Sequence, residues 1–129
     1  MAFGTAGVVI IGLGIDVVAV ERIGRVLAAH GQRFLARCFA PEEVRRPTDA
    51  QHVAGLFAAK EAGLKALGTG WGASVSWHDL AVTHDPAGAP RLALRGAALR
   101  HAEREGATSV HVSITHAAGV AVAVVIIEK

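Results

Sequence analysis

The stretch that most restricts how this chain can fold is segment 57–70, FAAKEAGLKALGTG. Placed on a helix at about 100° per residue, its large apolar residues share one arc, and alanine and glycine fill most of the remaining surface. A helix that is apolar nearly all round packs inside a protein. We therefore expect the chain to fold around this helix, with Lys60, Glu61 and Lys65 at least partly removed from water and paired.

Sequence signals mark both ends of this helix. Thr48 predicts its start through a capping box with Gln51, and Gly68 predicts its end just past the last apolar residue. The stretch that contains Gly68, Thr69, Gly70 and Gly72 also puts backbone N–H groups beside two lysines. Such a loop suits a phosphate group, although a helix cap alone would explain Gly68.

Glu61 and Lys65 are four residues apart on the predicted helix. For a generic helix, the simplest interpretation is a stabilising pair that contributes about 0.2–0.5 kcal/mol. The apolar surroundings and the adjacent glycine loop make this interpretation the less favoured one here, so we expect the two charges to act on a ligand.

Helical spacing dominates the first part of the chain, and strand patterns dominate the last part. Gly31 should end a first helix, and a second helical segment and a short turn closed by Pro47 should follow it. A short helix is expected at 97–105, and the expected strands are 8–18, 77–83, 91–95, 110–115 and 120–128. This order predicts an α+β fold with a mainly antiparallel sheet packed against the long helix.

Length and hydropathy predict one domain. At 129 residues we expect a single domain, residues 1–129, in which 1–7 form a flexible terminus. In a chain of this size, we expect a binding cleft to need residues from a second subunit. The long apolar runs, 8–20 and 120–127, are too short or too interrupted to cross a bilayer. Neither has the flanks of a signal peptide, so we expect a cytoplasmic protein without a membrane partner.

Charge and cysteine content exclude several classes of function. A net charge of +2 does not indicate nucleic acid as a partner. The single cysteine, Cys38, cannot form an internal disulfide, and we expect a buried thiol. Arginines crowd the first third of the chain, where solvated side chains and a surface for an acidic partner are equally good interpretations. They are Arg22, Arg25, Arg33, Arg37, Arg45 and Arg46.

Three ionisable residues occupy positions that structure alone does not explain. Asp16 lies in an apolar strand, Glu61 in an apolar helix and His116 at a strand end. Two carboxylates without a thiolate cluster suit Mg²⁺, which commonly takes one or two carboxylates, waters and substrate phosphates. Taken alone, His116 is better interpreted as a structural histidine than as a catalytic one. Carboxylates, lysines and a glycine loop together indicate transfer of a phosphorus-containing group.

These motifs resemble a known family. From residue 11 to residue 128 the chain is similar to the holo-acyl-carrier-protein synthases, the small type of 4'-phosphopantetheinyl transferase. The resemblance rests on four segments, of which the second is highly specific. They are GIDVVAVERI at 14–23, FAAKEAGLKALGTG at 57–70, GAPRL at 88–92 and HVSITH at 111–116.

The resemblance implies an activity and a metal. Such an enzyme moves the 4'-phosphopantetheine arm of coenzyme A to a serine of an apo acyl carrier protein and releases adenosine 3',5'-bisphosphate. Asp16 and Glu61 match the Mg²⁺ ligands. Lys65 matches a lysine near the phosphates that deprotonates or positions the serine, and His116 matches a histidine at the coenzyme A site.

The resemblance also implies binding surfaces. Gly68, Thr69 and Gly70 would line the nucleotide pocket, with Pro90 and Ser113 as further coenzyme A contacts. The family implies a homotrimer with clefts at subunit interfaces. Arg22 and Arg25 would dock the acidic helix of the carrier protein, chiefly setting encounter rate and orientation.

Two positions depart from the family pattern. Leu56 stands where many members have a basic residue, so that contact to a coenzyme A phosphate is either missing or supplied by Lys60 or an arginine elsewhere. Ala117 stands where some members have aspartate, which leaves Lys65, water or metal-bound hydroxide as the base. The alternatives to a transferase are a noncatalytic module that binds coenzyme A or a nucleotide, and a scaffold domain whose charge pairs are structural.

Overall fold

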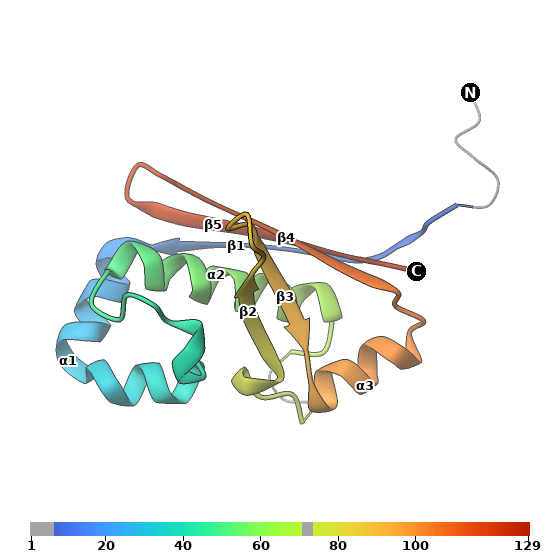
Figure 1. The fold of residues 1–129 in the computed structure, drawn as a ribbon, viewed down its shortest axis with the longest axis horizontal. Helices are drawn as coiled ribbons and strands as arrows, with labels where there is room; N and C mark the ends of the chain where they lie inside the picture. The colour runs from blue at the N-terminus through green and yellow to red at the C-terminus, as the bar shows by residue number, and fades with distance from the viewer. Residues whose placement is uncertain (1–6, 71–73) are drawn as a thin grey trace.

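The computed structural model describes residues 7–70 and 74–129. The expected flexible terminus, 1–7, lies outside these residues except for Gly7, and Gly72 of the predicted glycine loop also lies outside them. The helices are α1 (Val20–Cys38), α2 (Ala50–Leu67) and α3 (Gly96–Arg104), with the short 3₁₀ turns η1 (Pro41–Glu43) and η2 (Trp77–Asp79). The strands are β1 (Ile10–Ala19), β2 (Leu80–His84), β3 (Pro90–Leu94), β4 (Ser109–Ala117) and β5 (Val120–Glu128). The α+β fold predicted from the sequence is confirmed (Figure 1).

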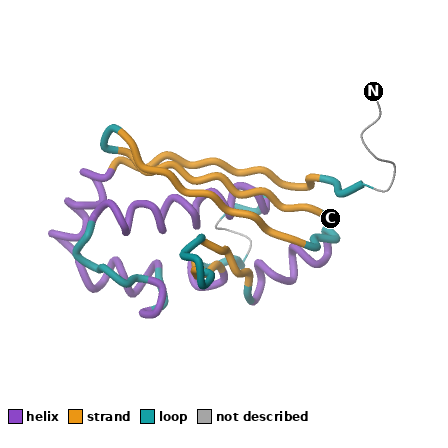
Figure 2. Tube along the Cα trace, turned by 45° about the horizontal axis from the view of Figure 1, so that its top comes forward, coloured by secondary structure: helices purple, strands orange, loops and turns teal. Residues whose placement is uncertain are grey.

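The strands form two antiparallel sheets. The larger sheet has the order β1-β5-β4, and β2 pairs with β3 in a separate hairpin. The larger sheet makes one layer of the molecule, and the helices lie together on one side of it (Figure 2). Alternate residues of β5, from Ala121 to Ile127, are buried beneath this helical layer. The mainly antiparallel sheet packed against a long helix is therefore present.

The long helix α2 is buried along most of its length, as its composition predicts. Gly68 ends it in the left-handed conformation, with φ of 75°, and this confirms the predicted cap. The predicted start is wrong by one residue. Asp49, not Thr48, caps the helix, because its carboxylate accepts hydrogen bonds from the N–H groups of Gln51 and His52.

Glycines let α2 lie very close to the sheet. An added Cβ at Gly14 would come within 1.9 Å of the Ala62 carbonyl oxygen, and one at Gly12 within 2.2 Å of that of Ala66. Near its other end α2 meets β4, where Gly55 faces His116. Because its C-terminal half contacts β1 and its N-terminal half contacts β4, α2 crosses the sheet diagonally.

Two sequence-based boundaries need correction. The expected strand at 77–83 begins only at Leu80, because Ser76 and Asp79 exchange hydrogen bonds and close the turn η2. The two early helices are one helix, α1, with a kink at Gly31, where φ is 7° and ψ is −95°. Gly31 thus interrupts the helical geometry without separating the two segments.

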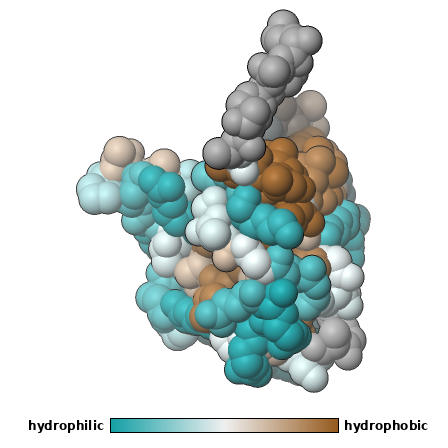
Figure 3. Space-filling view, turned by 90° about the vertical axis from the view of Figure 1, so that its right-hand side faces the viewer, coloured by the Kyte–Doolittle hydropathy of each residue, from teal (hydrophilic) through white to brown (hydrophobic). Residues whose placement is uncertain are grey.

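On the outer face of the larger sheet, β1 presents exposed apolar side chains. Leu13, Ile15 and Val17 of β1 point away from α2, and 64%, 57% and 60% of their respective surfaces are exposed. Figure 3 shows apolar surface gathered at the end of the molecule where β1 begins. Among the described residues no helix is both long and apolar enough to span a membrane.

Candidate active site

Lys65 and Asp16 meet across two elements. The Lys65 ammonium on α2 donates to the Asp16 carboxylate oxygen Oδ1 and to the carbonyl oxygen of Ile15, both at 3.0 Å. The Asp16 side chain is mostly buried at the β1 edge, whereas half of the Lys65 side chain is exposed. The cation and the carboxylate that the sequence singled out therefore lie together at the surface.

Glu61 comes from the part of α2 that packs on the same strand. It precedes Ala62, whose carbonyl oxygen faces Gly14. Asp16 follows Gly14 by two residues, so both point to the same face of β1. The fold thus brings Asp16 and the α2 segment that carries Glu61 to one side of the molecule.

The chemistry of these donors fits a hard cation. Within residues 7–70 and 74–129, no three histidine, cysteine or carboxylate groups are close enough to hold a metal ion. The two carboxylates, Asp16 and Glu61, offer oxygen atoms, and Asp16 already accepts a cationic ammonium group. A Mg²⁺ ion needs few protein ligands because water and substrate phosphates complete its shell. The donor set therefore fits Mg²⁺ and leaves positions for a substrate.

The glycine loop differs in detail from the expectation. The Gly68 N–H group donates to the carbonyl oxygens of Leu64 and Lys65 at 3.1 Å, so it caps the helix and is not free for a phosphate. Gly70 also has a positive φ, of 66°. The Thr69 hydroxyl is buried and has no hydrogen-bond partner among the described residues. Thr69 is thus the polar group of this loop that a ligand would satisfy.

Thr69 lines a polar cleft of about 250 Å³ between the loop and α3. Arg100 and Arg104, one turn apart on α3, also line this cleft together with His101. None of these three residues was predicted from the sequence to be part of a site. Their spacing of four on an amphipathic helix was the signal that could have found them.

Pro90 and His116 lie in a second cleft, of about 400 Å³, around the N-terminal half of α2. His116 Nε2 lies 2.9 Å from the carbonyl oxygen of Gln51, so this nitrogen carries the proton. Leu56, which replaces a basic residue of the family pattern, lines the same cleft. The structure therefore brings together two of the predicted coenzyme A contacts and the departure at Leu56.

Basic side chains also line this second cleft. Arg46 is largely exposed and pairs with Asp49 at 3.7 Å. Burial, and then the charge of Arg46, lower the pKa of His52, and burial also lowers the pKa of His84. The Nε2 atom of His52 is buried without a partner among the described residues. Of these residues only Arg46 was predicted from the sequence, as part of a basic surface. Both histidines were missed, because their spacing shows no motif.

The two groups of site residues lie apart within one chain. Asp16 and His116 are on the two edge strands, β1 and β4, with β5 between them. Two strand spacings separate these edges, about 10 Å, and α2 packs over β5 between them. The group formed by Asp16 and Lys65 and the group formed by Pro90 and His116 therefore lie on opposite sides of α2.

Lys60 does not line either cleft. Its side chain is fully buried, and its ammonium donates to Glu43 Oε2 at 2.9 Å and to the carbonyl oxygens of Cys38 and Trp77 at 2.7 and 3.1 Å. Desolvation lowers its pKa, and the hydrogen bond and charge of Glu43 oppose that shift. The expected contact of Lys60 with coenzyme A is therefore wrong, because its charge is used inside the protein.

The remaining predicted residues lie at the surface. Ser113 is exposed on β4 and pairs in register with Val124, on the outer face of the sheet. Arg22 and Arg25 are exposed on α1, and Arg25 forms an ion pair with Glu21 at 3.3 Å. Cys38 is buried as expected, and burial raises the pKa of its thiol to about 11. A thiol with so high a pKa is a poor nucleophile at neutral pH.

Comparisons with known proteins agree on one family. A sequence model of the 4'-phosphopantetheinyl transferase superfamily matches residues 12–125. The holo-[acyl-carrier-protein] synthase of Solidesulfovibrio magneticus is 52% identical over 119 residues, which cover 91% of this chain and 97% of that protein. The enzyme of the same name from Anaeromyxobacter sp. strain K is 53% identical over 126 residues, which cover 92% and 96%.

Solved structures give the same result. The holo-[acyl-carrier-protein] synthase of Neisseria meningitidis superposes with a TM-score of 0.81 at 35% identity, covering 94% of this chain and all of that one. The Helicobacter pylori enzyme in complex with coenzyme A has a TM-score of 0.80 at 34% identity, covering 89% and 98%. The fold, the grouped residues and these relatives together show that the chain belongs to the 4'-phosphopantetheinyl transferase superfamily, among its holo-[acyl-carrier-protein] synthases.

Proposed function

We propose that this protein transfers 4'-phosphopantetheine from coenzyme A to a serine of an apo acyl carrier protein and releases adenosine 3',5'-bisphosphate. The observation that carries the proposal is the contact between Lys65 and Asp16 beside the α2 segment of Glu61. This arrangement offers two carboxylates for a cation and one ammonium for a phosphate. The names of the relatives and the bound coenzyme A in the Helicobacter pylori enzyme agree with it.

In this reaction the serine oxygen forms a bond to the β-phosphorus of coenzyme A, and the phosphorus–oxygen bond to the nucleotide breaks. A base accepts the serine proton, and the nucleotide leaves with the bridging oxygen of the pyrophosphate. Mg²⁺, held by Asp16 and Glu61, would neutralise charge on the pyrophosphate. Lys65 would contact the reacting phosphate and orient the serine, and the position of its ammonium at the Asp16 carboxylate supports this role.

We assign the second cleft to an anionic part of coenzyme A. Leu56 offers no charge there, but Arg46 lies in the same cleft and supplies a cation at the surface. The His116 ring is held by its hydrogen bond to the carbonyl oxygen of Gln51 and by packing against Gly55. Of the two sources considered for the missing basic residue, an arginine elsewhere is therefore supported and Lys60 is not.

The Thr69 cleft is a second surface for the nucleotide. Its buried hydroxyl without a partner among the described residues and the two arginines of α3 suit phosphate oxygens. We propose that Thr69 and Gly70 contact the nucleotide, while Gly68 only shapes the loop through its cap.

We further propose a homotrimer with active sites between subunits. Within one chain, Asp16 and Lys65 lie on the opposite side of α2 from Pro90 and His116, so one bound coenzyme A needs the second set from a neighbouring subunit. The exposed apolar side chains of β1, on the outer face of the larger sheet, supply a surface for such contacts. Ser113 lies on this face, where it would reach a neighbouring site.

A mass-shift experiment tests the activity. Incubation with coenzyme A, Mg²⁺ and an apo acyl carrier protein should add one phosphopantetheine to the intact mass of the carrier. Glu61→Gln should abolish the Mg²⁺-dependent shift while its circular dichroism stays that of the parent protein. The proposal is contradicted if the carrier stays unmodified here while a known synthase modifies it. Coenzyme A binding without transfer would favour the noncatalytic module.

A further inference from the structure

A buried ion pair joins five neighbouring segments of the protein. The Lys60 ammonium on α2 contacts the Glu43 carboxylate in η1, the carbonyl oxygen of Cys38 at the end of α1 and that of Trp77 in η2. The three N–H bonds of the ammonium are therefore all used. The ring of Phe39 also lies 4.8 Å from this nitrogen.

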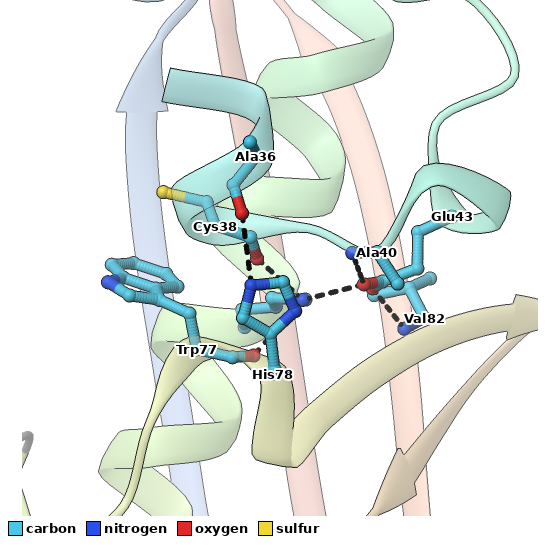
Figure 4. A network of polar contacts seen from close by, with 8 residues as sticks. Ala36, Cys38, Ala40, Glu43, Trp77, His78 and Val82 are labelled. Atoms are coloured by element: carbon cyan, nitrogen blue, oxygen red, sulfur yellow. Dashed lines mark hydrogen bonds and ion pairs between the residues drawn. The ribbon is translucent and has the colours of Figure 1, made fainter. Parts of the chain in front are cut away.

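Glu43 extends the network to the backbone of β2. Its Oε2 atom accepts from the N–H group of Ala40 at 2.8 Å, and its Oε1 atom accepts from that of Val82 at 2.9 Å. Figure 4 shows Cys38, Ala40, Glu43, Trp77 and Val82 converging on this point. The carboxylate is as buried as the ammonium, so this network is sealed from water.

Stability alone does not explain such a pair. Buried ion pairs are often replaced by apolar side chains of similar volume without loss of stability. Charged hydrogen bonds add direction, because each bond fixes the position of an atom along a line. The network therefore fixes where Lys60, and hence this part of α2, lies relative to η1, η2 and β2.

The opposite side of α2 is fixed as well. Gly14 of β1 lies against the backbone of Ala62, in a contact that has no space for a Cβ atom. Glu61 stands between Lys60 and Ala62 in the sequence. Glu61, the candidate metal ligand, thus lies between two rigid contacts. One is the ion pair of Lys60, and the other is the packing of the Ala62 backbone against that of Gly14.

We infer that Lys60 and Glu43 are positioning residues that hold Glu61 in place beside Asp16. This inference rests on the proposed transferase function, in which both carboxylates bind one cation. A displacement of about 1 Å from such a geometry can lower a rate about 100-fold. Loss of the ion pair should therefore weaken cation binding and turnover even where the fold remains.

The double variant Lys60→Met, Glu43→Gln tests this inference. Methionine keeps most of the volume of lysine, and glutamine keeps an oxygen for one of the two backbone donors, so no buried charge is left unpaired. Binding of Mn²⁺, used in place of Mg²⁺, is measured by electron paramagnetic resonance with coenzyme A present and no carrier protein. Steady-state turnover and the melting temperature are measured on the same samples.

We expect the double variant to need at least tenfold more Mn²⁺ for half-saturation and to lose at least tenfold in kcat, with the KM for coenzyme A within threefold of the parent. Ala98→Gly, at a buried position of α3 away from this network, is the control for lost stability. It should keep Mn²⁺ binding at a lowered melting temperature. A folded double variant that binds Mn²⁺ within twofold of the parent, or a control that loses binding equally, would overturn the positioning role.

If the double variant does not fold, Glu43→Asp, which keeps both charges and shortens the side chain that carries the carboxylate by one methylene group, is judged by the same thresholds. The parent protein separates this inference from the proposed function. A parent that does not modify the carrier rejects the function itself, whereas an active parent beside a double variant with unchanged Mn²⁺ binding rejects only the positioning role.

Discussion

Arg46 and Leu56 line the same cleft in different environments, and these environments support the proposal that Arg46 supplies the cation that Leu56 lacks. Leu56 is buried in the wall of the cleft, whereas Arg46 is largely exposed at its edge. The only ion pair recorded for Arg46 among the described residues is the long contact with Asp49. A phosphate can therefore recruit Arg46 at small cost.

At the residue scale, Arg46→Ala should raise the KM for coenzyme A about fivefold. A hydrogen bond between charged groups contributes about 1.5–3 kcal/mol, which exposure to solvent reduces to about 1 kcal/mol. The KM is measured by the mass-shift reaction at saturating carrier protein. Arg91→Ala, which breaks an exposed pair with Asp85 outside the cleft, should leave this KM unchanged. If Arg46→Ala and the parent have the same KM for coenzyme A, Arg46 does not contribute to coenzyme A binding.

At the element scale, the contact between β1 and α2 sets the position of the proposed metal ligands. Gly14→Ala should lower the free energy of unfolding by about 3 kcal/mol, because the new Cβ would lie 1.9 Å from the carbonyl oxygen of Ala62. Urea unfolding followed by circular dichroism measures the change. Gly24→Ala, in α1, is the matched control, because the new Cβ would meet only the Ala50 side chain, at 3.7 Å. This substitution should stabilise α1 by about 0.5–1 kcal/mol. A Gly14→Ala protein as stable as the parent would contradict the close packing.

The exposed start of α1 carries the proposed dock for the carrier protein. Arg22→Glu should raise the KM for the carrier at least fivefold at low salt, because it places a negative charge before an acidic partner. The difference should shrink as salt screens the interaction. Arg91→Glu on the β2–β3 hairpin makes the same charge change elsewhere. If both variants raise this KM equally, the dock is not on α1.

At the scale of the whole molecule, the apolar outer face of the sheet predicts association. Ile15→Lys should convert the assembly into single chains of 13.3 kDa, because it places a charge among the exposed apolar side chains of the proposed interface. Light scattering coupled to size-exclusion chromatography measures the mass. Leu99→Lys, at an exposed apolar position of α3, is the control and should leave the assembly intact. An Ile15→Lys protein with the mass of the parent would place the interface elsewhere.

Much of the fold was predictable because its signals are local. Gly68 ends α2 at the predicted place, since only a residue that tolerates a left-handed conformation fits there. Composition alone placed α2 in the core. The cap at Asp49 and the turn at Trp77 were missed, because in each case several adjacent polar side chains can accept the same backbone N–H hydrogen bond.

The sequence by itself determined the buried helix, the α+β order and the residues Asp16, Glu61 and Lys65 as a group with shared chemistry. Only the tertiary structure decided how the charges are used. Lys60 and Lys65 lie on one helix with the same side-chain chemistry, but Lys60 bonds with Glu43 in the interior and Lys65 meets Asp16 at the surface. Spacing along a helix gives the direction of a side chain, whereas its partner comes from distant segments that packing brings to that side.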